Sequence, residues 1–130
     1  MLVLDASVVI RACDATGGFD LLGDTALVAP ALMWSEVRSA LHEAAWRGEV
    51  SSARAEKMLR ALEDGPVQLC AHESLGYEAW RVADELGMAK TYDAEYVALA
   101  RLLDCRLVTL DGRLRRGAER LGFVVGPSEL

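Results

Sequence analysis

The hydrophobic and polar positions of this chain of 130 residues alternate between short apolar runs and longer segments with helical spacing. Apolar runs bounded by glycine, proline or acidic residues are typical of buried strands, and apolar residues that recur every three to four positions indicate amphipathic helices. The runs that fit the strand pattern are 1–5, 26–29, 67–71, 106–110 and 123–125. The segments that fit the helix pattern are 6–13, 31–47, 51–64, 73–86, 91–103 and a short arginine-rich segment after Gly112.

The order of these segments predicts the fold. Strands that alternate with helices favour a mostly parallel sheet with helices on both of its faces. We therefore expect an α/β fold, a three-layer α/β/α sandwich, built as a single domain over residues 1–130. The two helices within residues 31–64 follow each other without a strand between them, so they should form a helical hairpin.

Composition narrows the class of protein. Hydrophobic residues make up 52% of the chain, yet no apolar stretch approaches the length of about 20 residues that a membrane span needs. The first residues lack the basic region and cleavage site of a signal peptide, so we expect a cytoplasmic protein without membrane association. The three cysteines are too widely spaced for a disulfide set or a ligand pair. The net charge of −6 argues against nucleic-acid binding by the whole surface, but leaves room for a local site.

Two acidic residues follow predicted strands. Asp5 and Asp111 stand at the carboxyl ends of the first and fourth strands, which is where ligands bind in an open parallel sheet. Each also has a simpler explanation. Asp5 can cap the next helix, and Asp111 can form an Asp-Gly turn. For either residue taken alone, the simpler explanation is favoured.

Two more acidic residues lie on helices, close to apolar faces. Glu36 stands beside the apolar stripe of its helix, and Asp93 shares a face with the apolar residues three, four and seven positions after it. A carboxylate in such a place needs a partner, although Asp93 also fits a first-turn acid that complements the helix dipole. We expect Tyr96 to pack in the core and Glu95, one step off the Asp93 face, to be solvated.

The four acids together say more than each alone. Parallel topology brings the ends of strands one and four to one edge, and Glu36 lies only roughly 8 to 9 Å along a helix that starts there. We therefore expect Asp5, Glu36, Asp93 and Asp111 to converge, where unpaired they would repel each other. Oxygen-only ligands suit Mg²⁺ or Mn²⁺, and the chemistry of these ions on phosphates points to phosphodiester hydrolysis.

Four blocks of sequence resemble the PIN-domain ribonucleases, specifically the VapC-type toxins of toxin-antitoxin pairs, over nearly the whole chain. The blocks are Leu4-Asp5-Ala6-Ser7-Val8-Val9, Pro30-Ala31-Leu32-Met33-Trp34-Ser35-Glu36-Val37, Tyr92-Asp93-Ala94-Glu95-Tyr96-Val97-Ala98-Leu99-Ala100 and Leu107-Val108-Thr109-Leu110-Asp111. The resemblance implies a metal-dependent endoribonuclease that cuts a particular RNA, is silenced by a cognate antitoxin and forms a homodimer. It also implies that the four acids are the catalytic metal site and that Ser7 and Thr109 steady the carboxylates or a water.

Arginines and tryptophans supply the remaining candidates for binding. Residues 101–120 hold six arginines and three acids, a local excess of three positive charges. Arg113, Arg115 and Arg116 lie just past Asp111 and are candidates for RNA phosphate contacts, with a solvated surface as the alternative. We assign the hairpin to partner binding, and its residues Trp34 and Trp46 fit either an aromatic contact surface or core packing.

Two alternatives compete with the nuclease hypothesis, in which water attacks an RNA phosphodiester to leave a 5′-phosphate and a 3′-hydroxyl. A signalling receiver domain also carries acids at strand ends, but it needs an acid pair after the first strand and a lysine after the last paired strand. Asp5 stands alone, and the only lysines are Lys57 and Lys90, neither suitably placed. A catalytically silent PIN-like interaction module is the second alternative, and the retention of all four acids argues against it.

Overall fold

The computed structural model describes all residues from 1 to 130 and places a five-stranded sheet at the centre of the molecule. The strands are β1 (Leu2–Leu4), β2 (Leu27–Ala29), β3 (Gln68–Leu69), β4 (Arg106–Val108) and β5 (Val124–Val125). Their order across the sheet is β3-β2-β1-β4-β5, and every neighbouring pair is parallel. The predicted parallel sheet is therefore confirmed.

The central strand β1 determines where chemistry can occur. All of its residues are buried, as expected for a strand covered on both faces, whereas the edge strand β3 is exposed. Leu4 pairs with Val108 at the last position of β1 and of β4, so the two strands end side by side. Whatever follows Leu4 and Val108 in the sequence therefore begins at the same edge of the sheet.

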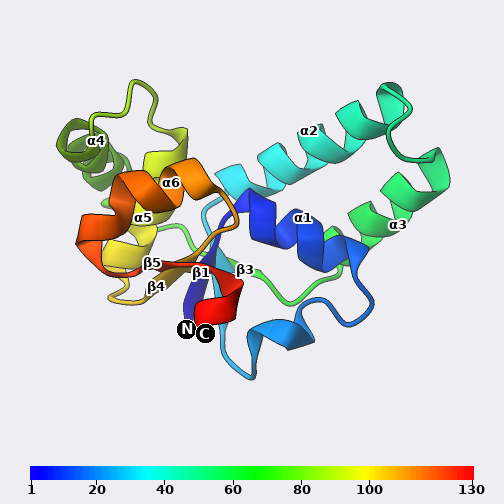
Figure 1. The fold of residues 1–130 in the computed structure, drawn as a ribbon, viewed down its shortest axis with the longest axis horizontal. Coiled ribbons are helices and arrows are strands. Elements are labelled where there is room, and N and C mark those ends of the chain that lie inside the picture. Colours follow the sequence, from blue (N-terminus) through cyan, green and yellow to red (C-terminus); the bar gives the residue numbers. More distant parts are fainter.

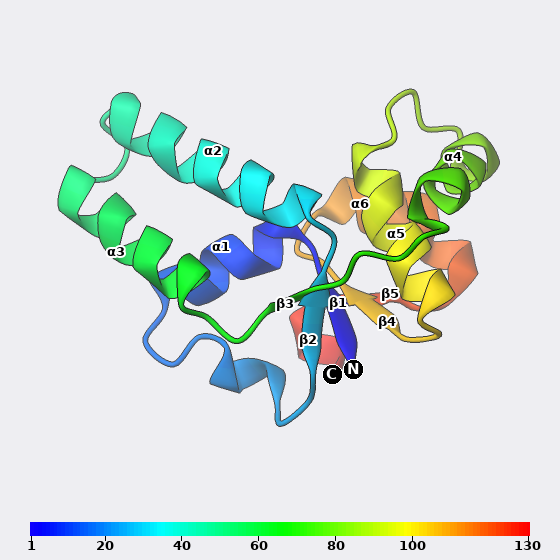
Figure 2. The same cartoon turned by 180° about the vertical axis from the view of Figure 1, so that it is seen from behind.

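Helices cover both faces of the sheet, which confirms the three-layer α/β/α arrangement. The helices are α1 (Ala6–Asp14), α2 (Leu32–Trp46), α3 (Ser52–Glu63), α4 (Leu75–Leu86), α5 (Tyr92–Leu102) and α6 (Gly112–Ala118). Helices α1, α2 and α3 lie on one side of the sheet, and α4, α5 and α6 lie on the other, as both views show (Figures 1 and 2). None of these helices has the length and apolar character that a membrane span requires.

Helices α2 and α3 form the predicted hairpin, which extends to one side of the sheet and packs on α1 (Figure 1). Gly48 reverses the chain after α2 with a positive φ of 73° that suits glycine. Ser51 then caps α3, because its hydroxyl accepts a hydrogen bond from the Arg54 amide at 3.1 Å. The side chains of Arg38 and Glu63 join the two helices through an ion pair of 2.6 Å.

The connection after α1 is more ordered than the sequence suggested. Between α1 and β2, where the sequence pattern predicts no regular element, Asp20–Leu22 form a short 3₁₀ helix, and Leu22 is buried. Gly18 allows this segment to approach α1, since a Cβ at this position would lie 2.2 Å from the Ala12 carbonyl oxygen. Glycine is therefore required where this connection packs on the core.

Candidate functional site

Asp5 is the N-terminal cap of helix α1, at the carboxyl end of β1. It follows β1 with extended backbone angles, and its Oδ1 accepts a hydrogen bond from the Val8 amide at 3.2 Å at the start of α1. The simpler explanation from the sequence is thus part of its role. A cap is normally partly hydrated, but Asp5 is only 6% exposed, so both of its oxygens need partners from the protein.

Two hydroxyl groups supply those partners and join Asp5 to the end of β4. Ser7 Oγ donates to Asp5 Oδ1 at 2.6 Å, and Thr109 Oγ1 donates to Asp5 Oδ2. Each hydroxyl is itself held by the backbone after β4, because Ser7 Oγ accepts from the Leu110 amide at 3.0 Å and Thr109 Oγ1 from the Asp111 amide at 2.9 Å. The orientation of the Asp5 carboxylate therefore depends on the pairing of β1 with β4.

Asp111 is also a helix cap. Its Oδ1 accepts hydrogen bonds from the amides of Arg113 at 2.9 Å and Leu114 at 3.3 Å, at the start of α6. The expected Asp-Gly turn is therefore the first turn of a helix. The other oxygen, Oδ2, accepts no hydrogen bond within the protein, so half of this carboxylate is free to bind something else.

The two helical acids lie in different surroundings. Glu36 on α2 is half-buried, and its Oε1 accepts a hydrogen bond from the Tyr96 hydroxyl at 2.5 Å. Asp93, in the first turn of α5, is exposed, and its carboxylate accepts no hydrogen bond within the protein. Tyr96 was expected only to pack in the core. It is indeed buried, but its hydroxyl also links α5 to α2.

Charge couples the four acids in a closed ring. Burial raises the pKa of Asp5 despite its three hydrogen bonds, and the charge of Asp111 raises it further. Burial also raises the pKa of Glu36, and the charges of Asp93 and Asp5 add to the rise. Partial desolvation and the charge of Asp111 raise the pKa of Asp93 although this side chain is exposed, and the charge of Arg113 opposes the rise. Each acid is therefore coupled to two of the others, which indicates that the four lie in one region.

A family model for the PIN domain matches residues 2–120 of the chain. The chain belongs to the PIN-domain family. It is also similar to Ribonuclease VapC9 of Mycobacterium tuberculosis, with 34% identity over 115 residues that cover 88% of each protein. This similarity confirms the resemblance to the VapC group that the four sequence blocks indicated, and it leaves the receiver hypothesis without support.

Solved structures agree with the PIN-domain fold. PAE2754 from Pyrobaculum aerophilum superposes with a TM-score of 0.78 and 25% identity, over 98% of this chain and 90% of that one. A chain of a toxin-antitoxin complex from Klebsiella pneumoniae superposes with a TM-score of 0.68 over 98% of each chain. Its identity is 16%, so this second comparison supports the fold alone.

The PIN domain offers donor atoms that suit a hard divalent cation. No three histidine, cysteine or acidic side chains are grouped closely enough to form a ligand set by themselves. Mg²⁺, however, usually keeps several waters and binds directly to only one or two carboxylates. Free oxygens remain on Asp93, on Asp111 and at Oε2 of Glu36. The chemistry and charge of these donors therefore fit Mg²⁺ or Mn²⁺.

The three arginines after Asp111 have different environments. Arg115 forms an ion pair with Glu129 near the carboxyl terminus, and its buried Nε has no hydrogen-bond partner. Arg113 and Arg116 are exposed and form no ion pair. The charge of Arg113 also reaches Asp93, so this side chain lies toward the acids. Arg115 is engaged within the protein, while Arg113 and Arg116 are available to a ligand.

Glu95 and Tyr96 lie near the four acids and have surroundings that differ from those expected from the sequence. Glu95 was expected to be solvated, but it is half-buried, and its pKa is raised by burial and by the charge of Glu36. The sequence held no signal for this charge interaction, which depends on how α2 meets α5. Tyr96 did carry a signal, because a tyrosine on a face otherwise made of alanine, valine and leucine brings a hydroxyl that needs a partner.

Proposed function

We propose that this PIN domain is a Mg²⁺- or Mn²⁺-dependent endoribonuclease and the toxin of a toxin-antitoxin pair. The ring of charge-coupled carboxylates beside β1 and β4 carries the proposal, because carboxylates that repel one another favour a bound cation, and the pKa values of Asp5, Glu36 and Asp93 are raised. The ribonuclease name of its relatives supports the choice of RNA as substrate.

The four acids have distinct parts in this proposal. Asp93 and Asp111 offer unoccupied oxygens for direct ligation. Asp5 is the buried acid of the site, and its hydrogen bonds hold its carboxylate in one orientation. Glu36 contributes its free Oε2 from α2. When bound, the cation stabilises charge on the phosphate and lowers the pKa of the attacking water. The water oxygen bonds to phosphorus and loses a proton, the bond to the 3′ oxygen breaks, and this oxygen takes up a proton, so the products are a 5′-phosphate and a 3′-hydroxyl.

The range of RNA substrates should be narrow. The net charge of −6 opposes general binding of RNA, so the positive groups near the site must be few and local. Arg113 and Arg116 are the exposed arginines on α6 that we assign to phosphate contacts. The Arg115 guanidinium would first have to leave Glu129 before it could bind a phosphate.

Cleavage by carboxylate variants tests the proposal. Asp5→Asn and Asp93→Asn should each abolish Mn²⁺-dependent cleavage of RNA by purified protein, and mapping of RNA 5′ ends after induced expression identifies the substrate. Asp104→Asn is the matched control, because Asp104 precedes β4 at the opposite edge and its φ of 50° is one that asparagine tolerates. Undiminished cleavage by the first two variants would refute the proposal. Failure to bind any divalent cation in calorimetry would favour a silent interaction module.

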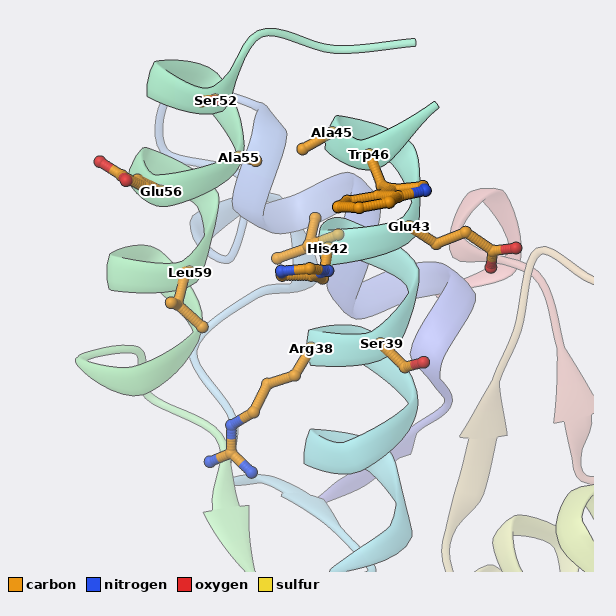
Figure 3. Close-up of a pocket in the computed structure, with 11 residues that line it drawn as sticks. Arg38, Ser39, His42, Glu43, Ala45, Trp46, Ser52, Ala55, Glu56 and Leu59 are labelled. Carbon is orange, nitrogen blue, oxygen red and sulfur yellow. The ribbon is translucent and has the colours of Figure 1, made fainter. Parts of the chain in front are cut away.

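We extend the proposal to an antitoxin partner, which the VapC resemblance of the four sequence blocks implies; a Klebsiella pneumoniae chain of the same fold is part of a toxin-antitoxin complex. We assign antitoxin binding to the hairpin, where a groove lies between α2 and α3 (Figure 3). His42 and Trp46 of α2 and Leu59 of α3 line the groove, and Trp46 is 83% exposed. Trp34, in contrast, packs against the core. An exposed tryptophan in a groove suits the apolar face of a partner helix.

Co-purification with the product of the neighbouring reading frame tests this assignment. Trp46→Ala should weaken the complex, because it removes the largest exposed apolar side chain of the groove. Trp80→Ala is the control, since Trp80 is an exposed tryptophan on α4, away from the hairpin. Loss of the complex in the control alone would contradict the assignment. Homodimerisation, which the family resemblance implies, remains a prediction that analytical ultracentrifugation tests directly.

A further inference from the structure

We propose that the Tyr96 hydroxyl positions the Glu36 carboxylate in the acidic site, an inference that rests on the function proposed above. Tyr96 is 1% exposed, so its hydroxyl does not reach substrate and acts through Glu36 alone. Its hydrogen bond to Oε1, at 2.5 Å, is the one hydrogen bond that the Glu36 carboxylate accepts from the protein. Asp5, in comparison, is held by three donors.

The contact connects two separate parts of the molecule. Glu36 belongs to α2, at the base of the hairpin on one side of the sheet, and Tyr96 belongs to α5 on the other side (Figures 1 and 2). Tyr96 lies three residues after Asp93 on α5, which places both side chains on neighbouring positions of one helix face. The hydrogen bond therefore sets the carboxylate of α2 relative to the helix that carries Asp93.

Packing does not require the hydroxyl. The neighbours of Tyr96 on α5, from Val97 to Ala100, are fully buried apolar residues, and phenylalanine would fill the same volume. A buried hydroxyl is unfavourable unless it is hydrogen-bonded, so its presence here needs a reason beyond the core.

The donated bond also leaves the right atom free. It occupies Oε1 of Glu36 and leaves Oε2 without a partner from the protein. A glutamate side chain has several rotatable bonds, so an unrestrained carboxylate would sample positions outside the site. With one oxygen fixed, the other is presented to a cation or water in a defined direction. Side chains that orient ligands in this way change metal affinity or activity by about 10- to 100-fold when removed.

Tyr96→Phe tests the inference through metal binding as well as cleavage. Calorimetry of the RNA-free protein should show Mn²⁺ affinity lowered by about 10-fold or more, and cleavage should lose kcat at an unchanged KM for RNA. The control is Tyr77→Phe, because Tyr77 is 80% exposed on α4 and makes no side-chain hydrogen bond. Thermal unfolding of both variants checks that the fold is kept.

A double-mutant cycle separates positioning from general damage. If Tyr96 acts through Glu36, Tyr96→Phe should not lower Mn²⁺ affinity further in a Glu36→Ala background, whereas additive effects would overturn the inference. Wild-type Mn²⁺ affinity in Tyr96→Phe, or a variant that does not fold, would overturn it too. The proposed function fails separately, when Asp5→Asn and Asp93→Asn retain cleavage. If these two lose cleavage while Tyr96→Phe behaves like wild type, only the role of Tyr96 is refuted.

Discussion

Replacing Thr109 with valine tests whether the hydroxyl bridge between β1 and β4 maintains the fold of the acidic site. Valine keeps the shape of the 0% exposed side chain but leaves Asp5 Oδ2 without its donor and the Asp111 amide without its acceptor. A hydrogen bond to a charged group contributes about 1.5 to 3 kcal/mol, and a buried unsatisfied group costs a similar amount. We expect the free energy of unfolding to fall by about 2 to 3 kcal/mol, and Tm by roughly 10 °C.

The loss should also depend on pH. Burial already raises the pKa of Asp5, and the Thr109 hydrogen bond opposes this rise, so Thr109→Val should raise the pKa further. A carboxyl whose pKa is higher in the folded than in the unfolded state contributes its stability below the unfolded pKa and loses it as pH rises toward the folded pKa. Because the folded-state pKa of Asp5 is higher in the variant, the variant loses stability over a wider pH range than the wild type. Its deficit relative to the wild type should therefore grow from acidic to neutral pH.

Urea unfolding followed by circular dichroism at about pH 4 and about pH 7 measures both effects. Thr91→Val is the matched control, because Thr91 is half-buried before α5 and its side chain makes no capping hydrogen bond. Thr109→Ser keeps the hydroxyl and should lose only the contribution of a methyl group. Equal losses in Thr109→Val and Thr91→Val, or a deficit that does not change with pH, would refute the reasoning.

Three other perturbations have defined outcomes. Asp93→Asn should stabilise the metal-free protein at neutral pH, because partial desolvation and the charge of Asp111 raise the pKa of Asp93; a lower urea midpoint would contradict this. Mn²⁺ should raise the Tm of the wild type and raise that of Asp93→Asn far less, as calorimetric scans with and without a chelator measure; equal shifts would exclude Asp93 as a ligand. Glu129→Gln should speed backbone hydrogen exchange after Val125, since Arg115 loses its anionic partner; unchanged exchange would show that the ion pair does not hold this segment.

The apolar pattern predicted the regular elements well, because most of them are buried on one or two faces. The helix expected over residues 31–47 is α2, Leu32–Trp46, and the strand expected over 106–110 is β4, Arg106–Val108. The short 3₁₀ helices Asp20–Leu22 and Pro127–Glu129 were not predicted, since three residues carry no periodicity. Strand ends were also overestimated, because pairing stops where the neighbouring strand stops.

The sequence predicted the site residues that follow strands but not the contacts between distant elements. Asp5 and Asp111 were placed by their position after apolar runs, and both lie where the strands end. The sequence could not show which atoms meet across helices. The contact between Tyr96 and Glu36 depends on how α2 meets α5, and the pairing of Arg115 with Glu129 depends on the path of the last residues. Such long-range polar contacts have no local pattern, so only the folded structure reveals them.

The bridge from Asp5 to Thr109 has a consequence for the order in which the chain assembles. The two residues are 104 positions apart, and the chain leaves the ribosome from its amino terminus. β1 must therefore wait without its neighbour β4 while the hairpin and helices α4 and α5 are made. Contacts of such long range close slowly. Asp5 receives its last hydroxyl donor only when synthesis is almost complete. A chain that stops before β4 therefore carries Asp5, Glu36 and Asp93 but lacks the strand and the Thr109 hydroxyl that hold Asp5 in the acidic site.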